Sequence, residues 1–75
     1  MDHDDRVKRV LALVADVTAF PAHYEALPAD ERLIVALALG RVNWLKAEGV
    51  DNIVQARDQV GRDWSRAVSA ARWKT

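Results

Sequence analysis

The side chains that could bind a metal ion are few and lie far apart in the sequence. The two imidazoles, His3 and His23, are separated by twenty residues, and the chain has no cysteine. Zinc sites need three or four ligands at short, characteristic spacings, and disulfides, iron–sulfur clusters and thiol catalysis all need cysteine. We therefore expect neither a metal site nor a cofactor.

Side chains that could act as catalytic nucleophiles are also few. Apart from the single tyrosine, the hydroxyl side chains are Thr18, Ser65, Ser69 and Thr75. No glycine-rich loop or Gly-x-Ser-x-Gly elbow surrounds any of them. The sequence thus predicts a protein that is not an enzyme.

Two arginines fall on apolar faces of expected helices, Arg41 beside Leu37 and Arg57 beside Ile53. An unpaired guanidinium is costly to bury, so each needs an acidic partner, a route by which its stem reaches water, or a ligand. One interpretation is structural: an internal ion pair, or a stem that passes a tryptophan to reach solvent. The other is functional: an anchor for the carboxylate or phosphate of a partner.

The three tryptophans differ in their expected surroundings. Trp44 and Trp64 occupy positions that fit a helical core. Trp73 falls on a polar helix side between Arg72 and Lys74, where it either covers the end of the bundle or is exposed as an interface anchor. Tryptophan is enriched among the residues that dominate protein interfaces, so Trp73 is a candidate partner-binding residue.

The segment from Arg62 to Lys74 has the polarity of a DNA recognition helix. Trp64, Val68 and Ala71 would face inward. Its polar positions are Arg62, Ser65, Arg66, Ser69, Arg72 and Lys74. With 11 basic and 11 acidic residues, however, the chain has no overall positive field, so DNA binding would depend on this local patch.

A break at Gly61 would turn residues 52–73 into a candidate helix-turn-helix motif. Two stretches, Leu27 to Arg32 and Ser65 to Ala67, are similar to region four of sigma factors. The segment before Gly61 is one residue longer than the usual motif, and nearby aspartates dilute the positive charge. Helix-turn-helix DNA binding therefore stays the alternative function, without assignment to that family.

The elements that position these residues are predicted to be helices. A stripe at helical spacing indicates a first helix over residues 5–19, which Pro21 would end, and a single helical turn fits residues 22–26. The stripe consists of Val7, Val10, Leu11, Val14 and Val17.

The second predicted helix spans residues 28–48, with Pro28 at its first position. One side would pack into the chain's own core through Leu33, Ile34, Leu37, Trp44 and Leu45. Val35, Leu39 and Val42 fall on nearly the opposite side. Two other helices leave part of this second row uncovered, so a partner protein or another subunit is expected there.

A sharp turn should follow this helix. Gly49 fits the left-handed position that ends a helix, with Val50 contacting Leu45, and Asp51 fits the next N-cap.

The third helix is predicted over residues 52–72. Its stripe continues through Gly61, which favours one continuous helix that tolerates a glycine, although two shorter helices stay possible. The stripe contains Ile53, Ala56, Val60, Trp64, Ala67, Val68 and Ala71.

Composition and length set the class of the protein. A 75-residue chain, 51% hydrophobic and 29% charged, fits a single globular domain over residues 1–75. The longest uncharged run, Leu33 to Gly40, is less than half of the roughly 20 residues that cross a membrane. The acidic N-terminus is unlike a secretory signal, and the lack of cysteine fits a cytoplasmic protein.

The sequence therefore predicts an all-α fold, a small three-helix bundle. Arginine outnumbers lysine, and alanine and valine are abundant, which suggests a GC-rich bacterium or its phage as the source. We expect a non-enzymatic interaction or regulatory module that binds a protein or itself, as a homodimer, without membrane or metal. The candidate partner-binding residues are Val35, Leu39, Arg41, Val42, Arg57 and Trp73.

Overall fold

The computed structural model describes residues 2–74, with side chains for residues 2–72, and shows an all-α protein. No strand occurs in the described range, which confirms the predicted fold class. The helices are α1 (His3–Ala19), α2 (His23–Ala26), α3 (Ala29–Leu39), α4 (Val42–Ala47), α5 (Ile53–Val60) and α6 (Arg62–Lys74).

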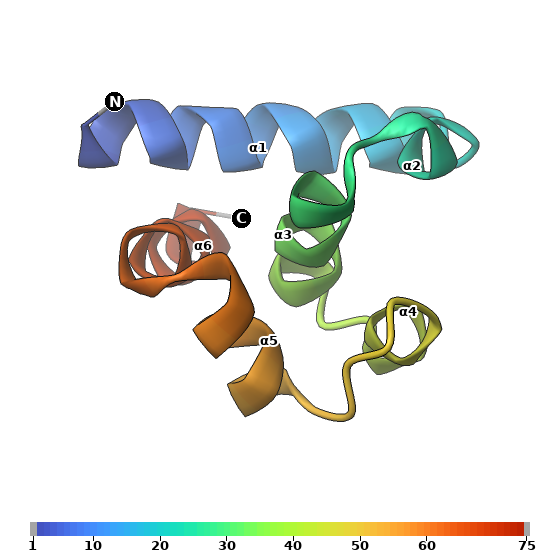
Figure 1. Ribbon diagram of the computed structural model, residues 1–75. Helices are drawn as coiled ribbons and strands as arrows, with labels where there is room; N and C mark the ends of the chain where they lie inside the picture. Colours follow the sequence, from blue (N-terminus) through green and yellow to red (C-terminus); the bar gives the residue numbers. More distant parts are fainter. Residues whose placement is uncertain (1, 75) are drawn as a thin grey trace.

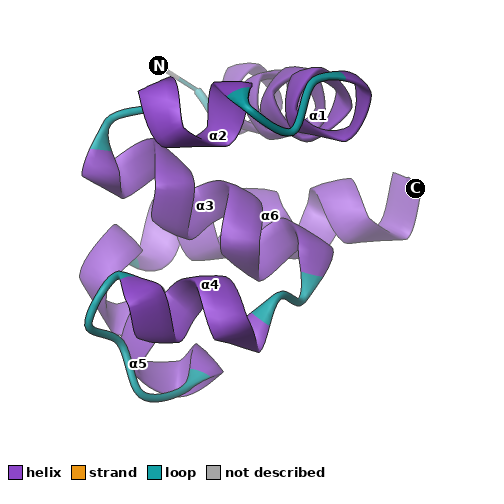
Figure 2. Cartoon of the chain, turned by 90° about the vertical axis from the view of Figure 1, so that its right-hand side faces the viewer, coloured by secondary structure: helices purple, strands orange, loops and turns teal. Residues whose placement is uncertain are grey.

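Helix α3 lies at the centre of the arrangement. It packs against α1, α4, α5 and α6, while α1 also packs along α6. Figure 1 shows α1 lying across one end of the molecule with α3 and α6 beneath it. Figure 2 shows α4 and α5 at the end away from α1, and the last turn of α6 projecting beyond the other helices.

Helix α1 begins two residues earlier than predicted because Asp2 caps it. The Asp2 carboxylate accepts a hydrogen bond from the Asp5 backbone N–H at 2.8 Å. The helix ends at Ala19, as expected from the proline that follows. The predicted turn at residues 22–26 is confirmed as the short helix α2.

The prediction of one helix over residues 28–48 is wrong, because the chain leaves the helical path at Gly40. Gly40 has a φ of +67°, and its N–H bonds the Leu37 carbonyl at 3.2 Å. The Arg41 N–H bonds the Ala36 carbonyl at 2.9 Å. This pair of bonds is a Schellman ending, which satisfies carbonyls at the end of α3 and requires a left-handed residue that glycine supplies without strain.

The turn after α4 was predicted correctly at Gly49, but the predicted N-cap of the next helix was wrong by one residue. The Val50 N–H bonds the Leu45 carbonyl at 2.9 Å, and both side chains are buried. Asn52, not Asp51, caps α5: its side chain accepts from the Gln55 N–H at 2.8 Å. The Gln55 side chain in turn accepts from the Asp51 N–H at 3.1 Å, so the two side chains satisfy donors reciprocally.

The preferred continuous helix over residues 52–72 is also wrong, and the alternative with a break at Gly61 is right. Gly61 has φ +91° and ψ +165°, a region open essentially only to glycine. Its N–H closes α5 on the Arg57 carbonyl at 3.1 Å, and its carbonyl accepts from the Ser65 N–H of α6 at 2.9 Å. The break lets α6 pack along α1 while α5 packs on α3.

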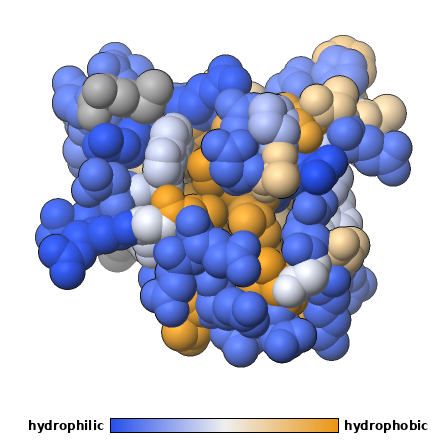
Figure 3. Space-filling model, viewed as in Figure 1, coloured by the Kyte–Doolittle hydropathy of each residue, from blue (hydrophilic) through white to orange (hydrophobic). Residues whose placement is uncertain are grey.

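The core forms where α1, α3 and α6 meet. Figure 3 shows apolar atoms in the middle of one face, ringed by polar side chains. Val35, predicted to lie on an uncovered side, is fully buried, because four helices surround α3. The buried residues are Val7, Val10, Leu13, Val17, Leu33, Ile34, Val35, Ala36, Leu37, Leu45, Val50, Ala56, Ala67, Val68 and Ala71.

The glycine breaks generate a stability prediction. No atom lies within 4 Å of a Cβ added at Gly40 or Gly61, so substitution there tests backbone conformation alone. We expect Gly61→Ala to lower the free energy of unfolding by about 1–3 kcal/mol, and Gly40→Ala by about 1 kcal/mol. Urea unfolding measures both. Gly40→Asn is the control and should cost less than Gly40→Ala, since asparagine tolerates the left-handed region; equal losses would contradict the assigned conformation.

Candidate functional site

The partner-binding candidates other than Val35 lie in different environments. Leu39 is half-buried at the end of α3, and Arg41 and Val42 are exposed at the start of α4. Arg57 is exposed on another helix, α5. The side chain of Trp73 lies outside the described residues. The structure thus brings Leu39, Arg41 and Val42 together at the break between α3 and α4.

Neither arginine expected on an apolar face lies on one. The break at Gly40 places Arg41 at the N-cap of α4, where its guanidinium carbon is 5.5 Å from the centroid of the Trp44 ring. This matches the interpretation in which the stem passes a tryptophan to reach water. Such a cation over an indole face contributes about 0.5–1 kcal/mol at an exposed site.

A small hollow opens between α1, α3 and the last part of α6. Its volume is about 90 Å³. Its described lining is apolar except for one arginine and consists of Leu11, Val14, Ala38, Leu39, Ala71 and Arg72.

A larger hollow opens between the end of α1, the end of α3 and α4. Its volume is about 370 Å³. It is lined by Val17, Thr18, Pro21, Leu39, Arg41 and Trp44. Leu39 lines both hollows, and we name the two adjoining hollows together the Leu39 groove. From Leu11 to Thr18 it follows α1 for seven residues, about 10 Å or two turns.

The Leu39 groove exists because of two local features. Leu11 and Val14 were expected in the core, yet both are half-buried, since they lie at the edge of the α1 stripe. On the other side of the groove, α3 ends at Leu39 because the chain changes direction at Gly40. Helix α4 therefore does not extend α3 past Leu39. Apolar side chains are therefore left facing the groove rather than a covering helix.

A polar and aromatic cluster holds α4 in place beside the groove. The Tyr24 and Trp44 ring centroids are 4.4 Å apart. Arg32, near the start of α3, places Nε 2.8 Å from Glu48 Oε1 at the end of α4. Both ends of α4 are thus tied to other elements, so Trp44, predicted as core, is half-buried with a fixed orientation at the groove wall.

The residues of the DNA-binding alternative share the outer side of α6 only in part. Arg62, Arg66, Ser69 and Arg72 are exposed, whereas Ser65 is half-buried. The side chain of Lys74 lies outside the described residues.

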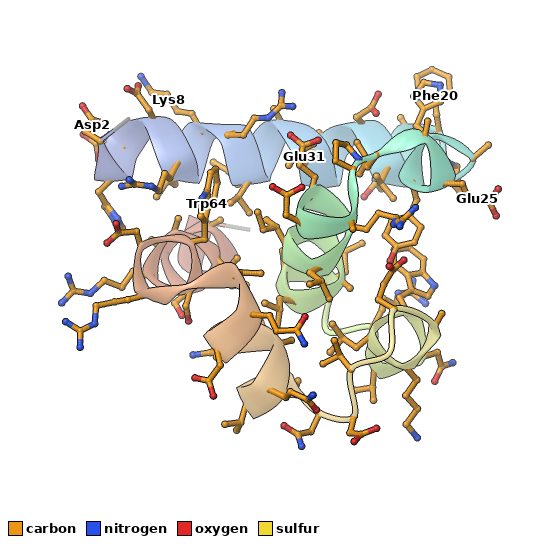
Figure 4. The ribbon with its side chains drawn as sticks, viewed as in Figure 1. Asp2, Lys8, Phe20, Glu25, Glu31 and Trp64 are labelled. Carbon is orange, nitrogen blue, oxygen red and sulfur yellow. The ribbon has the colours of Figure 1, made fainter. Side chains whose placement is uncertain are left out.

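Acidic and aromatic neighbours lie at the start of α6. Asp63 pairs with Arg6 of α1 at 3.5 Å, and Arg6 lies 6.0 Å from the Trp64 ring centroid. Figure 4 shows Trp64 between α6 and α1, where it is half-buried at the edge of the core rather than inside it. A hollow of about 380 Å³ here is lined by His3, Arg6, Asp63 and Arg66. Its charges are mixed, so it offers no clear preference for an anion or a cation.

Other surface features give less indication of a binding site. Phe20 projects from the bundle (Figure 4) and is 58% exposed, but its ring stacks on His23 at 5.0 Å. Within the part of the chain that the structure describes, no group of three His, Asp or Glu side chains is placed to hold a metal ion. No helix there is long and apolar enough to cross a membrane.

Comparisons of the chain with protein-family models, curated proteins and solved structures give no match.

The cluster behind the groove generates a pH prediction. Burial raises the pKa of the Tyr24 phenol, as does nearby Glu48, while Arg32 lowers it. The folded chain then keeps the phenol proton to higher pH than the unfolded chain. Its stabilising contribution is full below the ordinary value of about 10 and is lost as pH rises through the raised pKa.

Absorbance of tyrosinate measures this titration directly, because Tyr24 is the only tyrosine. We expect a midpoint above that of the urea-unfolded chain. In Tyr24→Phe, unfolding free energy should fall less steeply with pH in this alkaline window. A midpoint equal to that of the unfolded chain would show that the phenol is not buried as described.

Proposed function

We propose that this protein is a small non-enzymatic interaction or regulatory module of a bacterium or its phage, acting in the cytoplasm. It docks a protein helix, from a partner or a second copy, in the Leu39 groove. The observation that carries the proposal is that two largely apolar hollows adjoin at Leu39, one between α1, α3 and α6 and the other beside α1, α3 and α4.

The shape of the groove favours a protein over a small molecule. Small-molecule sites combine an apolar pocket with several converging polar groups. The described lining of the larger hollow offers as polar groups the Thr18 hydroxyl and the Arg41 guanidinium, both on exposed residues, and the indole N–H of half-buried Trp44. An open apolar depression between helices is instead the geometry in which an amphipathic helix docks.

Val42 is an exposed apolar residue next to the groove in the chain, although it lines neither hollow. It is 38% exposed and directly follows Arg41, which lines the larger hollow. A docked helix long enough to reach Val42 would remove further apolar area from water, at about 25 cal/mol for each Å². The proposal therefore keeps three of the residues named from the sequence, Leu39, Arg41 and Val42, and excludes buried Val35.

The break at Gly61 favours helix-turn-helix DNA binding as a second candidate. It separates α5 from α6 and leaves Arg62, Arg66 and Ser69 exposed along α6. Two features weigh against it: Asp63 lies among these residues, and a single residue joins the helices where the motif has three or four.

Docking in the groove is tested with a displayed library of amphipathic helical peptides, about three turns long, selected on the wild-type chain. We expect selected peptides to lose tenfold or more in affinity on Leu39→Lys, since burying a leucine contributes about 1.5–3 kcal/mol. Val54→Lys is the matched control, because Val54 is 71% exposed on α5 and lines neither hollow.

Sedimentation of the same variants tests whether a second copy of this chain occupies the groove. A wild-type dimer that Leu39→Lys converts to monomer would support docking through the groove. A wild-type monomer that selects no peptide, or peptides that bind Leu39→Lys equally well, would contradict the proposal.

Salt dependence tests the DNA candidate. If α6 contacts phosphates, affinity for duplex DNA should fall steeply with salt, and Arg62→Ala with Arg66→Ala should reduce the slope of log K against log salt by about 2. Lys8→Ala with Lys46→Ala removes the same charge elsewhere and should leave the slope unchanged. Equal slopes for the two double variants would eliminate α6 as a recognition helix.

A further inference from the structure

We infer that the occupant of the Leu39 groove is an acidic amphipathic helix, which lies along α1 with apolar side chains in the groove and a carboxylate against Arg41. The inference rests on the proposed function and specifies the chemistry of the partner. Its basis is the charge around the groove and the pairing of the arginines.

Charge around the groove has a single sign. Among the described lining residues of the two hollows, the charged ones are Arg41 and Arg72, and no acid is present. Arg72 already takes part in an interaction within the chain, so the charge that a partner can address at the groove is that of Arg41. A partner that covers the groove must therefore bring negative charge to complement it.

Arg41 differs from three other arginines in its partners. Arg6 pairs with Asp63, Arg9 with Glu31 and Arg32 with Glu48. Within residues 2–72, no ion pair or hydrogen bond involves the Arg41 side chain, which is exposed and is positioned only by its contact with the Trp44 ring.

That contact leaves Arg41 prepared for a carboxylate. The ring contact orients the planar guanidinium while its N–H donors stay accessible to a partner. A carboxylate can accept two parallel hydrogen bonds from such a group, which lysine could not supply. Because the group is already held at the groove edge, less side-chain freedom is lost on binding.

The shape of the groove favours a helix over an extended peptide. No strand exists in residues 2–74, so there is no sheet edge to which an extended partner could add. The groove follows α1 for about two turns, with a small hollow on one side of Leu39 and a larger one on the other. Apolar residues one turn apart on a partner helix would enter the two hollows, the smaller side chain beside Leu11 and the larger beside Trp44.

The test is a double-mutant cycle on a peptide selected with the wild-type chain. We expect the selected peptides to carry Asp or Glu next to their apolar positions. Replacing that acid by its amide should weaken binding to the wild type by about fivefold, the upper range for an ion pair open to water. The same replacement in the peptide should leave its affinity for the Arg41→Gln variant unchanged.

Arg57→Gln is the matched control, because Arg57 is an exposed arginine that lines neither hollow. It should keep the fivefold loss seen with the wild type. Thermal unfolding checks that both variants fold, which is expected since both arginines are exposed.

Each outcome has a distinct meaning. Two results would overturn the inference of an acidic partner while leaving docking in the groove intact. One is that the selected peptides are not enriched in Asp or Glu. The other is that replacing the acid by its amide weakens binding to Arg41→Gln as much as binding to the wild type. A dimer seated in the groove would also overturn it, in favour of a second copy. Peptides insensitive to Leu39→Lys would overturn both the groove and the inference.

Discussion

Gly40 holds a left-handed backbone conformation, and the placement of every element after Leu39 depends on it. With φ at +67°, the chain closes α3 through bonds to the Ala36 and Leu37 carbonyls and departs in a new direction. A continuous helix would have carried Val42 and Trp44 straight past the end of the core. The turn instead brings Trp44 back onto Tyr24, at 4.4 Å between ring centroids, and leaves Leu39 lining two adjoining hollows.

The same turn helps to explain how a 75-residue chain buries the middle of α3 on all sides. A domain of this size buries only about 60% of its unfolded surface, and two long partner helices would leave one side of the central helix open. Breaks at Gly40 and Gly61 divide two predicted helices into four shorter ones, so that α3 meets α1, α4, α5 and α6. Val35 is buried for this reason, although a helical wheel places it opposite the core row.

Hydrophobic periodicity predicted the locations of the helices more accurately than it predicted their ends. The stripe of α1, the turn at α2 and the ending at Gly49 followed from local rules, because each depends on residues within a few positions. The breaks at Gly40 and Gly61 were missed or not preferred, because the apolar spacing continues through both glycines. A glycine inside a helix costs only about 1 kcal/mol, so packing between distant helices decides whether it interrupts the helix.

For the candidate site, the sequence indicated Leu39, Arg41 and Val42 but not the groove itself. Its other wall comes from Leu11 and Val14, which periodicity assigns to the core and which are half-buried at the edge of the α1 stripe, beside α3 and α6. The unpaired state of Arg41 was also beyond prediction, since it depends on which acids the fold brings near; Glu31 and Glu48 pair with other arginines.

Incomplete burial alone does not account for the Leu39 groove. In a small domain, half-buried apolar residues are expected across the whole surface, where they need no explanation. Here Leu11, Val14 and Leu39 line one hollow, and the hollow that adjoins it at Leu39 is lined by Arg41, which has no acidic partner among the described residues. Apolar area and an uncompensated, oriented charge are independent features with no structural need to coincide, and their coincidence is what a docking surface for an acidic helix requires.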